Sequence, residues 1–236
     1  MGREAAVTLE LERIQAMMDA TIKIKEGDDR ASELVTYSFG RPTEQQNVVP
    51  TVKWSNQKAD VFADLKKWVK LMRTARGRAP HAVLTTSAVI DALTTNEQMR
   101  TAFSKMDLEH SPTSLFRTDV ENILRVKFQL TDIRYIDELY ESLSLDNNFE
   151  MNVDTTTLIP DSTFILFPSY NDDSLGFTAD GPTAEGQDAE FELGKDDGLV
   201  AYMLHHYAPA NYDLWVNGTA LPVLQDAVST FKAKVL

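Results

Sequence analysis

Histidines are the side chains of this chain that could most readily bind a metal or carry protons. The four are His81, His110, His205 and His206. His205 and His206 are adjacent, so on a strand their rings point to opposite faces and do not easily share one metal. Neither His-x-x-x-His nor His-Glu-x-x-His spacing occurs in the sequence. We therefore interpret all four histidines as structural or surface residues.

Two aspartate pairs, Asp172-Asp173 and Asp196-Asp197, invite a calcium interpretation. A calcium loop needs alternating Asp or Asn ligands, a central Gly and a closing Glu, and neither pair has that pattern. The sequence also lacks a Gly-x-Ser-x-Gly elbow, a phosphate-binding Gly-Lys-Thr and a dinucleotide fingerprint. No pair stands out among the 36 acidic residues as a catalytic dyad. The sequence predicts no catalytic, cofactor-binding or metal-binding residue, and thus a protein that is not an enzyme.

Composition narrows the class further. Hydrophobic residues make up 43% of the 236 positions and charged residues 25%, as in an ordinary soluble globular protein. The net charge of -13 argues against binding to a phosphate backbone, which needs clustered Lys and Arg. There is no Cys, so thiolate chemistry and disulfides are excluded. Neither a membrane span nor a signal peptide is visible, which predicts synthesis in the cytoplasm.

The basic residues gather on one expected helix, 60–75. Its apolar positions form one stripe that should face the core: Val61, Leu65, Trp68, Val69 and Met72. Its basic positions, with two that follow it, are Lys66, Lys67, Lys70, Arg73, Arg76 and Arg78. A nucleic-acid patch is one interpretation. A solvated helix face is favoured, because no interleaved aromatic residues or Gly-rich loop accompany the cluster.

The first half of the chain mixes helices with short strands. A stripe at Val7, Leu11, Ile14, Met18 and Ile22 predicts a helix over 4–22 that packs on strands within 33–39 and 212–231. Alternating residues predict a hairpin after it, with strands 21–25 and 34–39 around a turn at 26–32. A strand is expected at 82–86. Helices should follow N-caps at Ser87 and Asn96, and a capping box at Thr118–Glu121.

The second half reads as strands and loops. Strands are expected at 127–130, 133–140, 163–167 and 174–179, with a polar loop at 146–160. Asn217-Gly218 predicts a type I′ hairpin turn between 214–216 and 220–221. Helices interspersed with single short strands predict an α+β fold.

Several stretches of the chain resemble stretches of a known protein family and occur in the same order. They are Leu9–Met18 with Thr21–Ile24, Phe39–Arg41 with Gln45–Asn47, Val52–Ser55 with Ala59-Asp60, Pro160–Phe167, and Tyr212–Trp215 with Ala220–Val223. Their order resembles that of lambda-type tailed-phage major capsid proteins, the phage capsid E family. The first stretch is similar to the end of that family's long spine helix. Pro160-Asp161 resembles the turn before its late strand.

The resemblance implies an HK-type capsid fold with a spine helix, a peripheral domain (1–51 and 206–236) and an axial domain (52–205). It implies a subunit that self-assembles into an icosahedral shell around DNA, assembled in the host cytoplasm and found in the virion. Partners would be its own copies in hexamers and pentamers, with scaffold, portal and decoration proteins, and without cofactor, membrane or sequence-specific nucleic acid. Alternatives are an encapsulin-like nanocompartment subunit and a soluble hydrolase with dispersed carboxylates.

Contacts between copies are expected at charged loops. Arg73, Arg76 and Arg78 of one copy would meet acidic residues of a neighbour, drawn from Asp172, Asp173, Asp196 and Asp197. The resemblance implies an N-terminal arm and an extended loop that hold neighbouring copies together, and we expect this chain to lack both. We therefore expect this chain to be a monomer or small oligomer in dilute solution.

Overall fold

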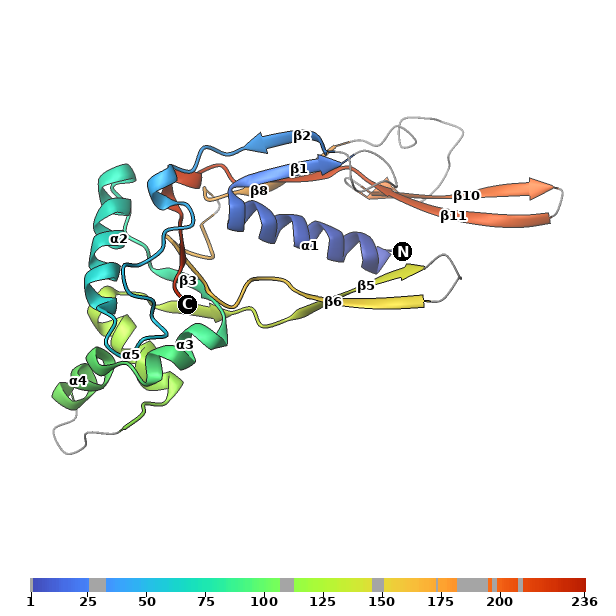
Figure 1. Cartoon of the computed structure of the whole chain (residues 1–236). Helices are drawn as coiled ribbons and strands as arrows, with labels where there is room; N and C mark the ends of the chain where they lie inside the picture. The colour runs from blue at the N-terminus through green and yellow to red at the C-terminus, as the bar shows by residue number, and fades with distance from the viewer. Residues whose placement is uncertain are drawn as a thin grey trace. The chain divides into compact units, whose positions relative to one another are not determined.

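The computed structural model describes residues 2–25, 33–106, 113–145, 151–172, 174–181, 195–196, 199–207 and 210–236. The chain forms two compact units, each built from separate stretches of sequence (Figure 1). The first unit comprises Met1–Phe39 and Gly176–Gln225, and the second comprises Gly40–Leu175 and Asp226–Leu236. The expected division into 1–51 with 206–236 and 52–205 has a continuous second domain, whereas the second unit here also includes the C-terminal stretch Asp226–Leu236. The assignment to peripheral and axial domains stays a prediction.

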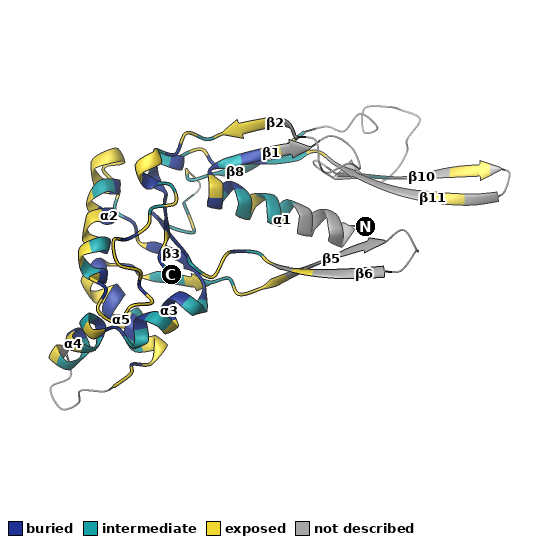
Figure 2. Cartoon of the chain, viewed as in Figure 1, coloured by how far each residue is buried: buried dark blue, intermediate teal, exposed yellow. Residues whose placement is uncertain are grey.

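The second unit is built around a mixed four-stranded sheet of order β13-β7-β3-β4. The strands are β3 (Ala82–Thr85), β4 (Asp132–Tyr135), β7 (Thr163–Phe167) and β13 (Phe231–Lys234). β3 is parallel to β4 and antiparallel to β7, and β13 is antiparallel to β7. Every residue of β3 and β7 is buried, because both are central strands covered by the rest of the unit (Figure 2).

Four helices share one hydrophobic cluster with this sheet. They are α2 (Val61–Arg76), α3 (Ser87–Thr94), α4 (Glu97–Met106) and α5 (Arg117–Phe128). All five apolar positions expected to face inward from α2 are buried. Trp68 stacks between Trp54 and Phe231, with ring centroids 5.4 and 5.1 Å away. These large aromatic contacts fix α2 on the sheet.

The helix starts show which capping predictions hold. Asn96 caps α4 as expected, since its Oδ1 accepts the N–H groups of Gln98 and Met99 at 2.9 and 3.2 Å. The prediction for Ser87 was wrong by one residue: it is the first residue of α3, and its N–H donates to Asp137 Oδ1 at 2.8 Å. The capping box at Thr118–Glu121 was wrong as well. α5 begins at Arg117, and the Phe116 N–H donates to Asp119.

A long antiparallel hairpin, β5 (Leu139–Leu145) with β6 (Met151–Thr157), also belongs to the second unit. The expected loop at 146–160 was therefore wrong over 151–157. Expected strand 127–130 begins inside α5, and expected strand 133–140 spans parts of β4 and β5. The Thr-rich sequence of β6 is polar, yet Thr is β-branched and suits a strand whose register comes from its partner.

The first unit begins with α1 (Gly2–Asp19), followed by the expected hairpin of β1 (Thr21–Lys25) and β2 (Glu33–Ser38). The turn expected at 26–32 lies outside the described residues. α1 packs against β1, β11 and β12, and its Ala16 and Met18 are buried. The helix ends earlier than expected because Ala20 has a φ of 51°. Ile22 is consequently buried on β1.

Two further sheets complete the first unit. β8 (Phe177–Asp180) pairs with β12 (Ala220–Val223), and β9 (Lys195–Asp196), β10 (Leu199–Tyr207) and β11 (Ala210–Gly218) form the other. The Asn217-Gly218 turn was wrong, because both residues continue β11 opposite Val200 and Leu199 of β10. β11 and β12 therefore belong to different sheets. Pairing with distant strands overrides the local turn preference here.

Candidate interaction surface

Charged side chains of the second unit meet where the chain passes to and from the first unit. Arg78 Nη2 lies 2.6 Å from Asp172 Oδ2, and its Nη1 donates to Ser174 Oγ at 2.9 Å. Arg76 Nε lies 3.3 Å from Asp226 Oδ1. The Asp226 N–H donates to the Leu175 carbonyl at 3.1 Å. This cluster thus ties together the last residue before the first unit's Gly176–Gln225 segment and the first residue after it.

Hydrogen bonds hold Asp172 in its charged form. The Ser174 hydroxyl donates to Asp172 Oδ1 at 2.5 Å, and this bond, with the Arg78 guanidinium beside it, lowers the pKa of Asp172. The side chain of Asp172 is 13% exposed and that of Arg78 41% exposed. The pair is therefore partly shielded from solvent, and it joins residues 94 positions apart within one chain.

The charged residues expected to contact a neighbouring copy differ in whether they already form an ion pair within the chain. Arg78 and Asp172 pair within the chain, and Arg76 pairs with Asp226, which the sequence did not single out. Arg73 lies elsewhere on α2. Asp196 is part of β9, with no side-chain description, and Asp173 and Asp197 lie outside the described residues. Contact of these residues with a neighbouring copy stays a prediction.

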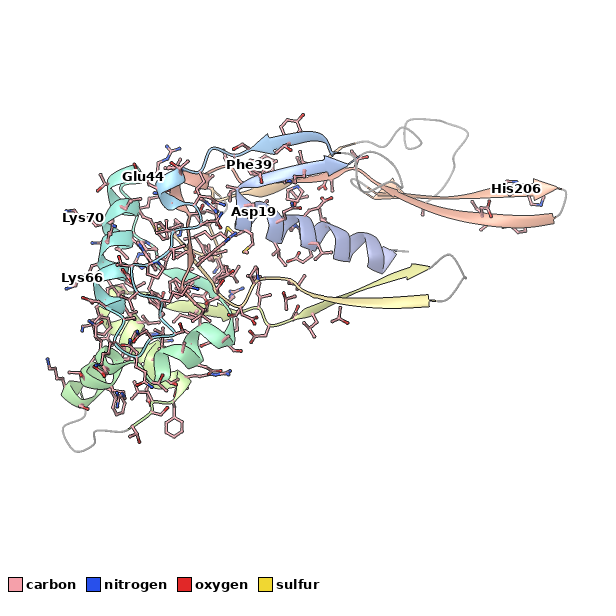
Figure 3. All side chains as sticks on the ribbon, viewed as in Figure 1. Asp19, Phe39, Glu44, Lys66, Lys70 and His206 are labelled. Atoms are coloured by element: carbon pink, nitrogen blue, oxygen red, sulfur yellow. The ribbon has the colours of Figure 1, made fainter. Side chains whose placement is uncertain are left out.

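A groove runs along the outer side of α2 beside the end of α5. Its volume is about 520 Å³, within the range of sites that hold ligands. It is lined by Lys66, Val69, Lys70, Arg73, Thr74, Val126, Lys127, Phe128 and Gln129. The α2 members lie three and four residues apart, which places them on one helix face. Figure 3 shows Lys66 and Lys70 projecting from the same side of that helix.

The groove joins cations to an apolar base. Val69 and Phe128 are 9% and 8% exposed, so they form its base. The Lys127 ammonium lies 3.6 Å from the centroid of the Phe62 ring, in a cation–π contact. Burial lowers the pKa of Lys127, and the charges of Lys66 and Lys105 lower it further. The sequence pointed to the α2 cations but missed Lys127, because its place beside α2 depends on how α5 packs.

The histidines take part in surface contacts. His206 Nε2 lies 2.9 Å from Asp213 Oδ2, and the His205 ring stacks on Tyr212 with centroids 4.6 Å apart. His81 Nδ1 lies 3.0 Å from the Gln129 carbonyl. His110 is outside the described residues. Within the described part of the chain, no three His, Asp or Glu side chains are grouped as metal ligands would be.

A third polar cluster stabilises the second unit between α3 and α5. Arg117 of α5 binds Asp91 of α3 through two hydrogen bonds, each 2.6 Å long. The Tyr135 phenol donates to Glu121, and burial together with this carboxylate raises the pKa of Tyr135. Tyr135 is therefore a neutral hydrogen-bond donor, and the cluster fixes α5 against α3 and β4.

The described charged groups thus form ion pairs, caps and one basic groove. None of the helices in the described residues combines the length and hydropathy that a bilayer span requires. Comparison with protein families gives a direct match: the model for phage major capsid protein E covers residues 1–235. The chain belongs to this family of bacteriophage capsid proteins.

Solved structures show the same fold at low sequence identity. A phage-related protein from Bordetella bronchiseptica RB50 matches with a TM-score of 0.56 and 11% identity over 98% of this chain. A proposed prophage capsid protein from E. coli CFT073 matches with a TM-score of 0.60 and 14% identity over 99%. The chain spans 63% and 64% of those two proteins. Comparison with curated proteins gives no match.

Proposed function

We propose that this chain is the subunit, or the core of the subunit, of an icosahedral virus shell that encloses DNA. The observation that carries the proposal is the capsid-family match over residues 1–235. A fold shared with a proposed prophage capsid protein supports it. A shell needs many identical surfaces closed by symmetry, and no reaction centre. The family match also favours this function over a nanocompartment subunit and over a hydrolase.

Within this proposal, α1 is the spine helix of an HK-type fold. The α2–α5 helices and their sheet are the body of the axial domain, which meets its copies around a capsomer centre. β13 pairs with β7 inside that sheet, which favours a peripheral domain ending before residue 226. The copies would form hexamers and pentamers in the host cytoplasm, with scaffold, portal and decoration proteins as further partners, and the virion as the final location.

The test is made on particles from cells that carry the gene. Particles are separated by sedimentation, imaged by negative-stain electron microscopy and digested for mass spectrometry. We expect icosahedral shells in which peptides of this chain are the most abundant, enclosing DNA that resists nuclease. Shells that lack the chain would contradict the proposal. Shells that contain it around a protein cargo, without DNA, would identify a nanocompartment instead.

A further inference from the structure

The α2–α5 groove brings four cations together: Lys66, Lys70, Arg73 and Lys127. Lys66, Lys70 and Arg73 recur along one face of α2, and Lys127 approaches from the end of α5. In the described residues none of the four forms an ion pair with a carboxylate. Arg76 and Arg78, which follow on the same helix and just after it, are both paired. The groove is therefore distinct from the ion-pair cluster described above.

Repulsion among these cations makes an anionic occupant favourable. Burial lowers the pKa of Lys127, and the charges of Lys66 and Lys105 lower it further, in keeping with cations that line one groove. The base of the groove is apolar, with Val69 and Phe128, and the 67% exposed Val126 also lines the groove. The occupant that matches both features carries carboxylates together with apolar side chains. Nucleic acid fits less well, because a chain of net charge -13 repels it at longer range.

Residues 182–194 have that chemistry. The stretch 137–154 is also acidic and apolar, but most of it is paired in the β5–β6 hairpin. The 182–194 segment carries four acidic residues, Glu185, Asp188, Glu190 and Glu192, and no basic residue. Its end reads Glu190-Phe191-Glu192-Leu193, so acidic and apolar residues alternate. In an extended peptide, alternate side chains face opposite sides, which would direct Phe191 and Leu193 to the base and the glutamates to the cations.

We propose that the α2–α5 groove binds the acidic segment 182–194 of a second copy of this chain. The inference rests on the proposed function, since it requires copies to associate, and it names one contact through which they do so. Charge complementarity of this kind sets the partner and the rate of encounter, and the apolar pair adds burial. Repeated around a symmetry axis, the contact would link each copy to the next.

The first experiment measures binding of a fluorescent synthetic peptide of residues 182–194 to the purified chain by anisotropy. We expect saturable binding that Lys70→Glu weakens about tenfold or more by reversing a charge in the groove. Lys67→Glu is the matched control, because Lys67 is exposed on the same helix and does not line the groove. It should leave binding within about twofold. Thermal melting should show both variants folded, and a peptide with Gln at 190 and 192 should bind poorly.

The second experiment shows which copy supplies the segment. A chain with Lys70→Glu keeps its segment, and a chain with Glu190→Gln and Glu192→Gln keeps its groove. Each alone should associate weakly in sedimentation, and a mixture should form pairs. The segment variant should also bind the peptide more tightly than the wild type, because its own segment no longer competes.

Several outcomes would overturn the inference. They are no peptide binding to either chain, equal losses for Lys67→Glu and Lys70→Glu, or tighter peptide binding by the segment variant with no pairing on mixing. The last would mean that the segment occupies the groove of its own chain. Short duplex DNA that binds through Lys70 in place of the peptide would identify a nucleic-acid surface. Normal shells built from Lys70→Glu chains would remove this contact while leaving the proposed function intact.

Discussion

Among single residues, several polar side chains stabilise the ends of helices. Asp60 is the clearest case, because it is the N-cap of α2. Its Oδ1 accepts the Ala63 N–H at 3.0 Å and the Gln98 side-chain amide at 2.7 Å. These hydrogen bonds, that of Gln98 first, lower the pKa of Asp60. One exposed carboxylate thus joins the start of α2 to α4.

Replacing this cap should lower stability in a pH-dependent way. Asp60→Ala should cost about 1 kcal/mol of unfolding free energy near neutral pH, measured by urea titration. Because the folded-state pKa lies below the unfolded one, the charge contributes fully above the unfolded pKa. The contribution is lost as pH falls through the folded pKa, so the gap to wild type should narrow in acid. Asp60→Asn keeps an acceptor and should cost less. A gap that widens in acid would contradict this account.

Gly176 is a second residue whose identity the structure explains. A Cβ at this position would lie 2.6 Å from the Val223 carbonyl oxygen, at one end of the β8–β12 pair. Backbone there must shift to admit a methyl group, so Gly176→Ala should destabilise the first unit by about 1–3 kcal/mol. Gly181 is the matched control at the other end of the pair. Its Cβ would meet the Thr219 side chain at 3.2 Å, so Gly181→Ala should cost less in thermal melting. Equal losses would refute the steric explanation.

At the scale of elements, α2 carries the core of the second unit. Leu65 of α2 is fully buried in the hydrophobic cluster of this unit, and Lys67 is exposed on the same helix. Leu65→Ala should therefore lower the unfolding free energy by about 2–5 kcal/mol. Lys67→Ala should stay within about 0.5 kcal/mol of wild type. Urea titration followed by the near-ultraviolet signal of Trp54 and Trp68 measures both, and similar values for the two variants would mean that α2 is not packed as described.

Elements with a strong internal period could be predicted from sequence. The five inward positions of α2 follow the helical repeat, and the apolar run of β7 could only be buried. Elements whose structure depends on a distant partner could not. The polar β6 forms a strand because β5 pairs with it, and Asn217-Gly218 continues β11 because β10 lies alongside. In both cases tertiary pairing outweighs local preference.

The candidate surface follows the same division. The cluster of basic residues on α2 was visible in the sequence, whereas the acidic partners of Arg76 and Arg78 were not. Arg78 could have met any of many carboxylates, and only the fold brings Asp172 to 2.6 Å. Lys127 lines the groove because the end of α5 lies beside α2, and the sequence does not indicate that packing. The spacing of residues in the sequence therefore indicates which side chains share one face of a helix. The residues of other elements that contact this face depend on tertiary packing.

At the scale of the whole molecule, the second unit has the properties of a domain that folds alone. It has its own sheet, four helices and one continuous hydrophobic cluster. The Gly176–Gln225 segment of the first unit is inserted between Leu175 and Asp226, whose backbone groups are hydrogen-bonded at 3.1 Å. The two ends of the insertion are thus close enough for a very short linker to join them.

We therefore expect the second unit to survive removal of the first. The variant starts at Gly40 and joins Leu175 to Asp226 through two added glycines, with Met1–Phe39 and Gly176–Gln225 deleted. It should unfold cooperatively in urea and retain the near-ultraviolet circular dichroism of the Trp54–Trp68 stack, whose rings are 5.4 Å apart. Adding Arg78→Ala should weaken it by at most about 1 kcal/mol, because that ion pair is partly exposed. A variant without cooperative unfolding would show that the two units form one folding unit, and that the core around α2 needs the first unit to assemble.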